Sequence, residues 1–209
     1  MPVYSVLMVN VFVFRDSSAA VLSAFFGITY TVLAGKGTPA CYIFGTAGMF
    51  FYSYLAFKNA LWGNLALYIG YYFPMNIAGY FLWKKNLKKE KNEIVKTSLG
   101  RRRTVLMLFS ALVVSLVLAY VLVLLKDKNP VIDGITTVFS VAAMFLTVRR
   151  CIEQWFFWGA VNGLSLIMWL DIALGGEKVY STVIMWGVYF LLAIYFYMAW
   201  KRDLAHDTR

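Results

Sequence analysis

Long apolar segments separated by short basic clusters constrain the fold of this chain more than any other feature. Seven such segments occur, at 18–34, 40–57, 60–83, 104–125, 130–148, 154–173 and 179–200. Each approaches the roughly 20 residues that an α-helix needs to cross the hydrocarbon core of a bilayer. With 61% hydrophobic and 14% charged residues, the chain is too apolar for a soluble domain. We therefore expect an all-α integral membrane protein with seven transmembrane helices.

The first 17 residues are expected to differ from the spans. The apolar run at 1–14 is short, and Arg15-Asp16-Ser17-Ser18 breaks it. Residues 1–17 therefore resemble an interfacial segment. No small-residue cleavage pattern follows a basic start, so no signal peptide is expected.

The distribution of lysine and arginine predicts the orientation in the membrane. The segment 84–103 carries nine of the 20 basic residues. If this loop is cytoplasmic, 15 of the 20 lie inside and 5 outside. The N-terminus is then outside, and the tail at 203–209 is cytoplasmic. The loop acts as a topology anchor on the anionic leaflet. The net charge of +10 requires no nucleic-acid partner, because the basic residues collect between apolar runs.

An internal repeat organises the chain. An offset of 117 residues aligns Gly70, Tyr72, Phe73, Tyr80, Trp83 and Lys84 with identical residues in the last span. An offset of 113 aligns Leu33 with Leu146 and Tyr42 with Trp155. We interpret residues 18–83 and 130–202 as two parallel three-helix repeats. The span at 104–125 is then a linker helix that restores the orientation of the second copy.

Aromatic and amide side chains share one face of the sixth span. On a helix with 100° per residue, Trp155, Trp158, Asn162 and Trp169 fall within an arc of about 60°. Polar side chains in lipid are costly and normally face a protein interior or a water-filled cavity. This face therefore predicts a cradle for a flat, polar ring. Packing or an interfacial aromatic belt is the alternative, most of all for Trp155 near the helix start.

The third span offers a partner contribution from the first repeat. Asn76 lies four residues after Tyr72, on the same face of a helix. The alternative role of Asn76 is an interhelical hydrogen bond that only stabilises the bundle. Pro74 lies inside the same span, where it removes a backbone donor and acts as a hinge or as a static bend.

The acidic residues of the spans lie near their ends. Asp133 and Asp171 are expected near the outer side and Glu153 near the inner side. Proton- or sodium-coupling acids are expected at mid-depth, so passive uniport is the simpler reading. Asp133 and Asp171 are candidates for an outer gate, with surface solvation as the alternative. The spans contain no histidine and no paired acids, so neither an enzyme, a metal site nor a cofactor is expected.

The chain resembles a known family of transporters over residues 19–202. Its 3+1+3 layout is similar to that of the SWEET sugar transporters, and its W-x-x-W-x-x-x-N motif, Trp155, Trp158 and Asn162, resembles the PnuC nicotinamide riboside transporters. The resemblance implies facilitated diffusion of nicotinamide riboside across a bacterial inner membrane, with a cytosolic kinase trapping it by phosphorylation. A homo-oligomer is compatible with the sequence.

The residues suit this substrate but leave alternatives. Indole faces attract a cationic pyridinium ring, and Asn162 can both donate and accept a hydrogen bond. No arginine or lysine is expected at mid-depth, which favours a nucleoside over a nucleotide. Thiamine, riboflavin and deoxynucleosides remain alternative cargoes on the same fold. A membrane assembly protein without transport activity is the alternative of another class.

Overall fold

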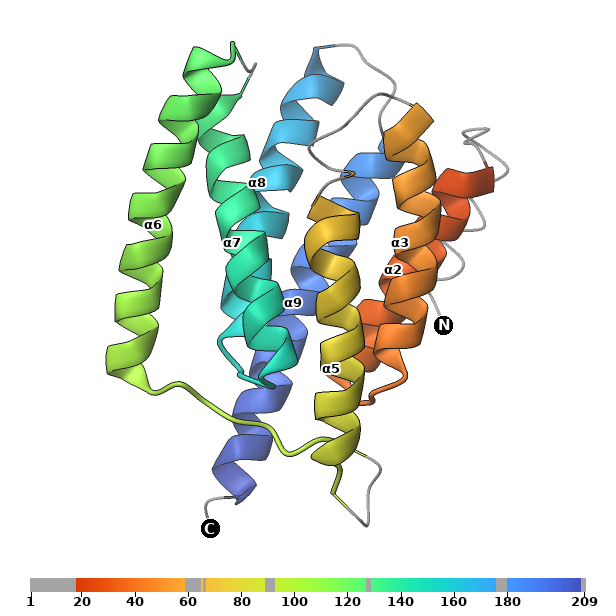
Figure 1. Ribbon diagram of the computed structural model, residues 1–209, viewed down its shortest axis with the longest axis vertical. Helices are drawn as coiled ribbons and strands as arrows, with labels where there is room; N and C mark the ends of the chain where they lie inside the picture. Colours follow the sequence, from red (N-terminus) through yellow and green to blue (C-terminus); the bar gives the residue numbers. More distant parts are fainter. Residues whose placement is uncertain are drawn as a thin grey trace. The chain divides into compact units, whose positions relative to one another are not determined.

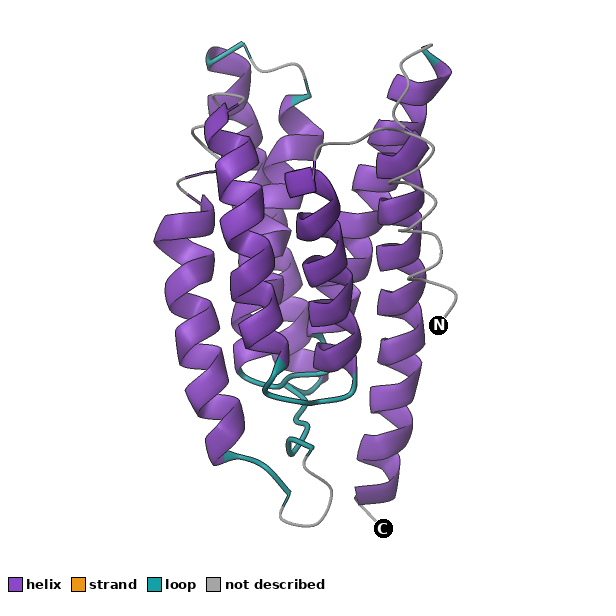
Figure 2. Cartoon of the chain, turned by 90° about the vertical axis from the view of Figure 1, so that its right-hand side faces the viewer, coloured by secondary structure: helices purple, strands orange, loops and turns teal. Residues whose placement is uncertain are grey.

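The described residues fold mainly into α-helices (Figures 1 and 2). The computed structural model describes residues 18–58, 65, 67–88, 93–126, 129–175 and 180–207. Within them lie seven α-helices: α2 (Ser18–Gly35), α3 (Cys41–Lys58), α5 (Phe73–Lys85), α6 (Arg101–Leu124), α7 (Pro130–Val148), α8 (Gln154–Leu174) and α9 (Tyr180–Asp207). The all-helical class is as expected. The segment predicted to be interfacial, 1–17, lies outside the described residues.

The helices belong to two compact units. The first, Met1–Val95, contains α2, α3 and α5, and the second, Lys96–Arg209, contains α6 to α9. In the first unit a π-helical turn, η1 (Tyr68–Tyr72), runs directly into α5. The predicted third span is therefore described from η1 onward, with Pro74 in the first turn of α5. Tyr72 and Phe73 keep helical backbone angles, and the Phe73 N–H donates to the Tyr68 carbonyl, so Pro74 lies inside a continuous helix and removes one backbone donor from it.

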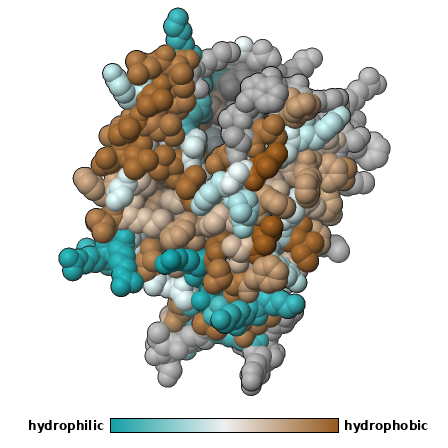
Figure 3. All heavy atoms as spheres, viewed as in Figure 1, coloured by the Kyte–Doolittle hydropathy of each residue, from teal (hydrophilic) through white to brown (hydrophobic). Residues whose placement is uncertain are grey.

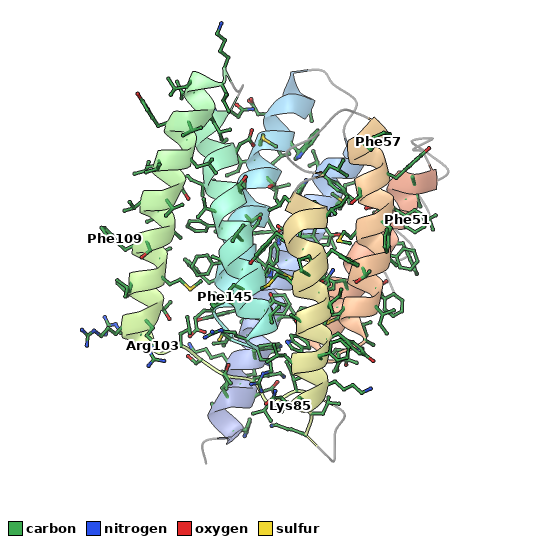
Figure 4. All side chains as sticks on the ribbon, in the orientation of Figure 1. Phe51, Phe57, Lys85, Arg103, Phe109 and Phe145 are labelled. Atoms are coloured by element: carbon green, nitrogen blue, oxygen red, sulfur yellow. The ribbon has the colours of Figure 1, made fainter. Side chains whose placement is uncertain are left out.

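Length and composition mark three of the described helices as able to cross a membrane. They are α6, α7 and the stretch Val183–His206 within α9, and a shorter apolar stretch, Val21–Gly35, lies in α2. The outer side of α6 is strongly apolar: Leu106, Phe109 and Leu116 are each more than 60% exposed. Figure 3 shows this side in brown, and Figure 4 shows Phe109 pointing away from the other helices. Side chains of this kind are solvated by lipid.

A stripe of small residues holds α6 against α7. Ala111, Ser115 and Ala119 are the buried residues of α6, each one helical turn from the next. A Cβ on Gly134 of α7 would lie 2.9 Å from the Ser115 carbonyl oxygen. The two backbones therefore approach closely, as small residues allow between membrane helices.

A buried tryptophan packs into the core of the first unit. Trp83, near the end of α5, is fully buried, and its ring meets that of Tyr42 on α3 edge to face at 5.1 Å. Gly79 lies one turn before Trp83, and a Cβ there would lie 2.3 Å from the Tyr42 ring. A glycine at this position is what lets the Tyr42 ring lie against α5.

The second unit has a similar aromatic pair. Trp200 of α9 is fully buried and meets Trp155 of α8 edge to face at 5.8 Å, with 80° between the rings. The corresponding angle between Tyr42 and Trp83 is 82°. Phe196, one turn before Trp200, also contacts Trp155, with ring centroids 5.2 Å apart. Edge-to-face pairs of this kind add about 0.5–1.5 kcal/mol to the burial of the rings.

The turns before α3 and α8 carry the same backbone hydrogen bonds. Thr38 N–H donates to the Leu33 carbonyl, and Cys151 N–H to the Leu146 carbonyl, both at 3.0 Å. Gly37 and Arg150 both have positive φ, 72° and 63°. The two turns thus have the same backbone geometry although their sequences differ. Arg150 adopts a backbone conformation that glycine adopts more readily than other residues.

Two helix ends differ from the sequence-based prediction. The linker helix begins at Arg101 rather than 104, after Gly100 with φ 79°. The last helix continues to Asp207 rather than ending at 200, so residues predicted to form a tail are helical. Lys96 explains this extension, because it forms an ion pair with Asp203 and lies 5.3 Å from the centre of the Trp200 ring.

The basic segment predicted as a loop contains extended backbone that binds both turns. In the first unit, Ile94 is buried and its N–H donates to the Gly37 carbonyl at 3.0 Å. In the second unit, Thr97 N–H donates to the Arg150 carbonyl, and Ile152 N–H donates back to Thr97, both at 2.9 Å. The segment is therefore an integral part of each unit, in addition to its expected role as a topology anchor.

Gly134→Ala should lower the free energy of unfolding by about 1–3 kcal/mol, because the added methyl group overpacks the α6–α7 contact. A thermal melt of the purified protein in detergent measures this effect. Gly70→Ala is the matched control, since a Cβ there meets nothing within 4 Å. An equal melting temperature for the two variants would contradict the close approach of α6 and α7.

Candidate functional site

The face of α8 predicted to form an aromatic cradle is mainly buried. Trp155 is 3% and Asn162 7% exposed, while Trp158 and Trp169 are half-buried. α8 packs between α7 and α9 in the second unit. Trp155, at the first turn, packs against Trp200 and Phe196 of α9, and its indole N–H has no hydrogen-bond partner among the described residues. The Trp155 ring is thus part of the aromatic core.

Trp158 is oriented by a hydrogen bond to α7. Its indole Nε1–H donates to the Thr147 hydroxyl oxygen at 3.1 Å. The Thr147 hydroxyl in turn donates to the Ala143 carbonyl of its own helix at 2.8 Å. Because its single donor is already used, Trp158 can offer a ligand only its ring face and edge.

Trp158 and its neighbour Ala143 differ in size from the corresponding residues of the first unit. On the 113-residue offset, Trp158 corresponds to Gly45 and Ala143 to Tyr30. A Cβ on Gly45 would lie 2.7 Å from the ring of Tyr30. The first unit therefore places a large side chain on its first helix over a glycine, whereas the second places an indole on α8 near the small Ala143. Only the second unit has an indole on this helix position.

Asn162 places a carboxamide in the mainly buried part of α8, and the residue is 7% exposed. An amide can both donate and accept a hydrogen bond. Ser165, at 5% exposed, lies one turn further along the same face. The sequence analysis missed Ser165, although its i+3 spacing from Asn162 places it on that face.

The first unit contributes a second buried carboxamide. Asn76 of α5 is 5% exposed and is one of the three buried residues of this helix. Tyr72, the last residue of η1, is half-buried, and its ring meets Tyr68 edge to face at 5.0 Å. Tyr68 stacks on Tyr52 of α3 at 4.3 Å. An aromatic cluster thus lies one helical turn from Asn76.

The gate and hinge candidates lie at helix ends. Asp133 is in the first turn of α7 and half-buried, and Asp171 is exposed in the last turn of α8. A carboxylate at a helix N-terminus, as at Asp133, is stabilised by the helix dipole. Pro74 is exposed and directly follows η1, so a π-helical turn and a proline adjoin in the third helix. Both features are common sites of helix bending.

The thiol of the α7–α8 turn is not activated as a nucleophile. Burial raises the pKa of Cys151 above its ordinary value, and the Thr97 hydroxyl oxygen, 3.5 Å away, only partly offsets this effect. At neutral pH the group is therefore a thiol rather than the nucleophilic thiolate. Both cysteines of the chain are free and buried.

These features define a class: a helical membrane protein with an apolar exterior and isolated amides in its interior. A family model described as "Nicotinamide mononucleotide transporter" matches residues 17–202. The chain therefore belongs to this family of membrane transporters.

Three known proteins are similar to this chain in sequence or structure. The nicotinamide riboside transporter PnuC of Neisseria mucosa is 30% identical over 198 residues, which cover 92% of this chain and 75% of that protein. PnuC of Haemophilus influenzae is 28% identical, with 90% and 80% covered. A crystal structure of the vitamin B3 transporter PnuC superimposes with a TM-score of 0.78 at 28% identity, covering 95% of this chain and 88% of the other.

Thr147→Val should lower the free energy of unfolding by about 1–3 kcal/mol, since it leaves the indole N–H of Trp158 without an acceptor. Chemical unfolding monitored by tryptophan fluorescence would measure the change. Thr136→Val is the control on the same helix, because Thr136 bonds only to backbone carbonyls, of Ile132 and Asp133. If both variants unfold alike, the hydrogen bond to Trp158 contributes nothing.

Proposed function

We propose that this protein transports nicotinamide riboside across the bacterial inner membrane by facilitated diffusion. The named relatives support the cargo, since the similar proteins of Neisseria mucosa and Haemophilus influenzae are nicotinamide riboside transporters. The N-terminus lies outside and the C-terminus in the cytoplasm in this proposal, as the distribution of lysine and arginine predicts.

The single observation that carries the proposal is the pair of buried carboxamides. Asn162 and Asn76 are 7% and 5% exposed. An amide both donates and accepts, so it can bind the carboxamide of nicotinamide or a ribose hydroxyl group. A hydrogen bond to a buried polar ligand is worth about 1–3 kcal/mol. In the proposal, each amide is a substrate-binding residue at mid-depth in the membrane.

Aromatic side chains complete the proposed site. Trp158 presents its ring, held by Thr147, and Tyr72 belongs to an aromatic cluster beside Asn76. The pyridinium ring of nicotinamide riboside is cationic, and stacking on an aromatic face contributes about 0.5–2 kcal/mol. Trp169 lies further along α8 and would line the same path. Trp155 packs against Trp200 and Phe196 in the aromatic core of the second unit.

The charge distribution favours the riboside over the mononucleotide named in the family description. The lysine and arginine residues of the described helices lie at or near helix ends, and α2, α7 and α8 contain none. A phosphate group at mid-depth would have no cationic partner from these helices, at a cost of several kcal/mol. The riboside lacks the phosphate group, and aromatic faces can stabilise its cationic pyridinium ring. The mononucleotide is therefore the second candidate, because the family description names it.

The position of the acids supports uniport. Asp133 is in the first turn of α7, Asp171 is in the last turn of α8, and Glu153 precedes α8. None occupies the middle of a described helix, where a coupling acid would meet both a cation and the substrate. Net uptake then follows the gradient, and phosphorylation by a cytosolic kinase keeps the riboside inside the cell.

The two units are proposed to be copies of one three-helix bundle. The equal turn geometry at Gly37 and Arg150 and the two edge-to-face aromatic pairs support this relation. Transporters built from repeats alternate between inward- and outward-open states by movement of one repeat against the other. Pro74 and η1 provide a bend in the first unit for which the second has Leu191, so only the first unit would carry this hinge.

Proteoliposomes containing the protein should take up radiolabelled nicotinamide riboside down its gradient, with no dependence on a proton or sodium gradient. Thiamine, riboflavin, a deoxynucleoside and nicotinamide mononucleotide are tested beside it. Flux of the mononucleotide alone would overturn the assignment of the riboside. If none of the five compounds moves, the protein is not a transporter of this class.

Asn162→Leu should weaken binding of nicotinamide riboside by about 1–3 kcal/mol, or roughly 5- to 150-fold, because a hydrogen bond to a buried polar ligand is lost. Calorimetry on the purified protein measures the affinity. Met49→Leu is the matched control, since Met49 holds the corresponding register position in the first unit and is buried. An unchanged affinity in Asn162→Leu would make this amide a structural group.

A further inference from the structure

A cavity at one end of the second unit lies apart from the proposed substrate residues. It has a volume of about 500 Å³ and is lined by the start of α6, the residues before α8 and the last turns of α9. Arg101 and Lys201 line it, together with Glu153. The remaining wall is largely apolar and includes Val105 and Tyr197. The cavity therefore combines both signs of charge with an apolar surface.

Glu153 is the group that points to a ligand. It is 8% exposed, and its Oε1 accepts hydrogen bonds from the Ser98 hydroxyl at 2.6 Å and from the Leu99 N–H at 3.0 Å. Its second oxygen, Oε2, is buried and has no hydrogen-bond partner among the described residues. A buried carboxylate oxygen without a donor is costly, so a cationic donor would stabilise it.

The turn itself does not require this acid. On the 113-residue offset Glu153 corresponds to Ala40. The Ala40 carbonyl accepts the Phe44 N–H at 3.4 Å, and the Glu153 carbonyl accepts the Phe157 N–H at 3.3 Å. The same helix start thus forms with alanine in the first unit. The carboxylate of the second unit must be explained by what its side chain binds.

Two cations that line the cavity suit a phosphate group. Arg101 is the first residue of α6, whose N-cap, Gly100, provides no side-chain cap. The first N–H groups of a helix and its dipole favour an anion. Lys201 adds a second cation from α9. Two cations, a helix start and a carboxylate that line one cavity match a zwitterion with a phosphate and an ammonium group.

The surroundings place this zwitterion at the surface of the bilayer. Val105 in the wall of the cavity and Leu106 next to it on α6 are apolar and 59% and 65% exposed. Figure 3 shows hydrophilic residues at the same end of the brown face of α6, and Figure 4 shows Arg103 there, extending outward. Tyr197 is of the residue type that concentrates at the headgroup level. Acyl chains leaving the cavity would lie on the apolar face of α6.

We propose that this cavity is a binding site for a phospholipid with a primary ammonium headgroup, such as phosphatidylethanolamine. The phosphate binds Arg101, Lys201 and the start of α6, and the ammonium group donates to Oε2 of Glu153. The bound lipid fixes the first turn of α6 to the last turns of α9. This site is separate from substrate transport and does not depend on the identity of the cargo.

The test is a titration of delipidated full-length protein in detergent with short-chain lipids, followed by native mass spectrometry and thermal shift. Phosphatidylethanolamine should bind about 10-fold or more tightly than phosphatidylcholine, which has no N–H donor, or phosphatidylglycerol, which has no ammonium group. Equal affinity for the three lipids would overturn the proposal. Phosphoethanolamine tests whether the ligand is a membrane lipid or a soluble phosphate ester. If it binds as tightly as phosphatidylethanolamine, the site is assigned to a soluble phosphate ester.

Glu153→Gln should abolish the preference for phosphatidylethanolamine while leaving the binding of phosphatidylglycerol within about 3-fold. The double variant of Arg101→Gln with Lys201→Gln should weaken all three lipids by about 10-fold or more. Lys84→Gln is the matched control, because Lys84 corresponds to Lys201 in the first unit and is likewise exposed.

Should Glu153→Gln not fold, Ala205→Trp tests the site without changing its charges, because a large ring on this exposed lining residue fills the cavity. Loss of phosphatidylethanolamine binding in Ala205→Trp supports the site. Retention of the preference in either variant would show that the lipid binds elsewhere and would overturn the assignment.

Discussion

The edge-to-face packing of a buried tryptophan near the end of the third helix is the interaction on which each unit depends. Trp83 meets Tyr42 in the first unit, and Trp200 meets Trp155 in the second. Each pair joins the last helix of its unit to the start of a helix that follows a turn with one residue at positive φ, Gly37 or Arg150. Lipid solvates apolar side chains as well as a protein interior does, so specific contacts of this kind must hold membrane helices together. The rest of each bundle is positioned from this end.

A shared backbone with different side chains explains how two similar units acquire separate roles. Where the first unit has Ala40, Gly45 and Met49, the second has Glu153, Trp158 and Asn162 at the corresponding positions. None of these exchanges alters the turn or the helix that follows it. The second unit therefore gains an acid, an indole and an amide on one element without a change in its fold. The first unit places its own buried amide, Asn76, on α5 instead.

The proposed substrate and lipid sites follow one electrostatic rule. Mid-helix positions carry neutral amides and aromatic rings, which tolerate burial, whereas charged groups gather where the helices begin and end. A neutral interior with hydrogen-bonding groups is suited to a permeant nucleoside. The charged ends are suited to phosphate and ammonium groups of lipid.

The sequence by itself determined the helical class, most helix bounds and the common face of Trp155, Trp158 and Asn162. Backbone groups in lipid must be paired within a segment, so long apolar runs can only be helices, and the helical period then fixes which residues share a face. Only the tertiary structure decided that Trp155 lies against Trp200, that Ser98 and Leu99 bind Glu153, and that Lys96 extends the last helix through Asp203. These contacts join residues about 50 or 100 positions apart. No local period encodes them, because they depend on which distant segments pack together.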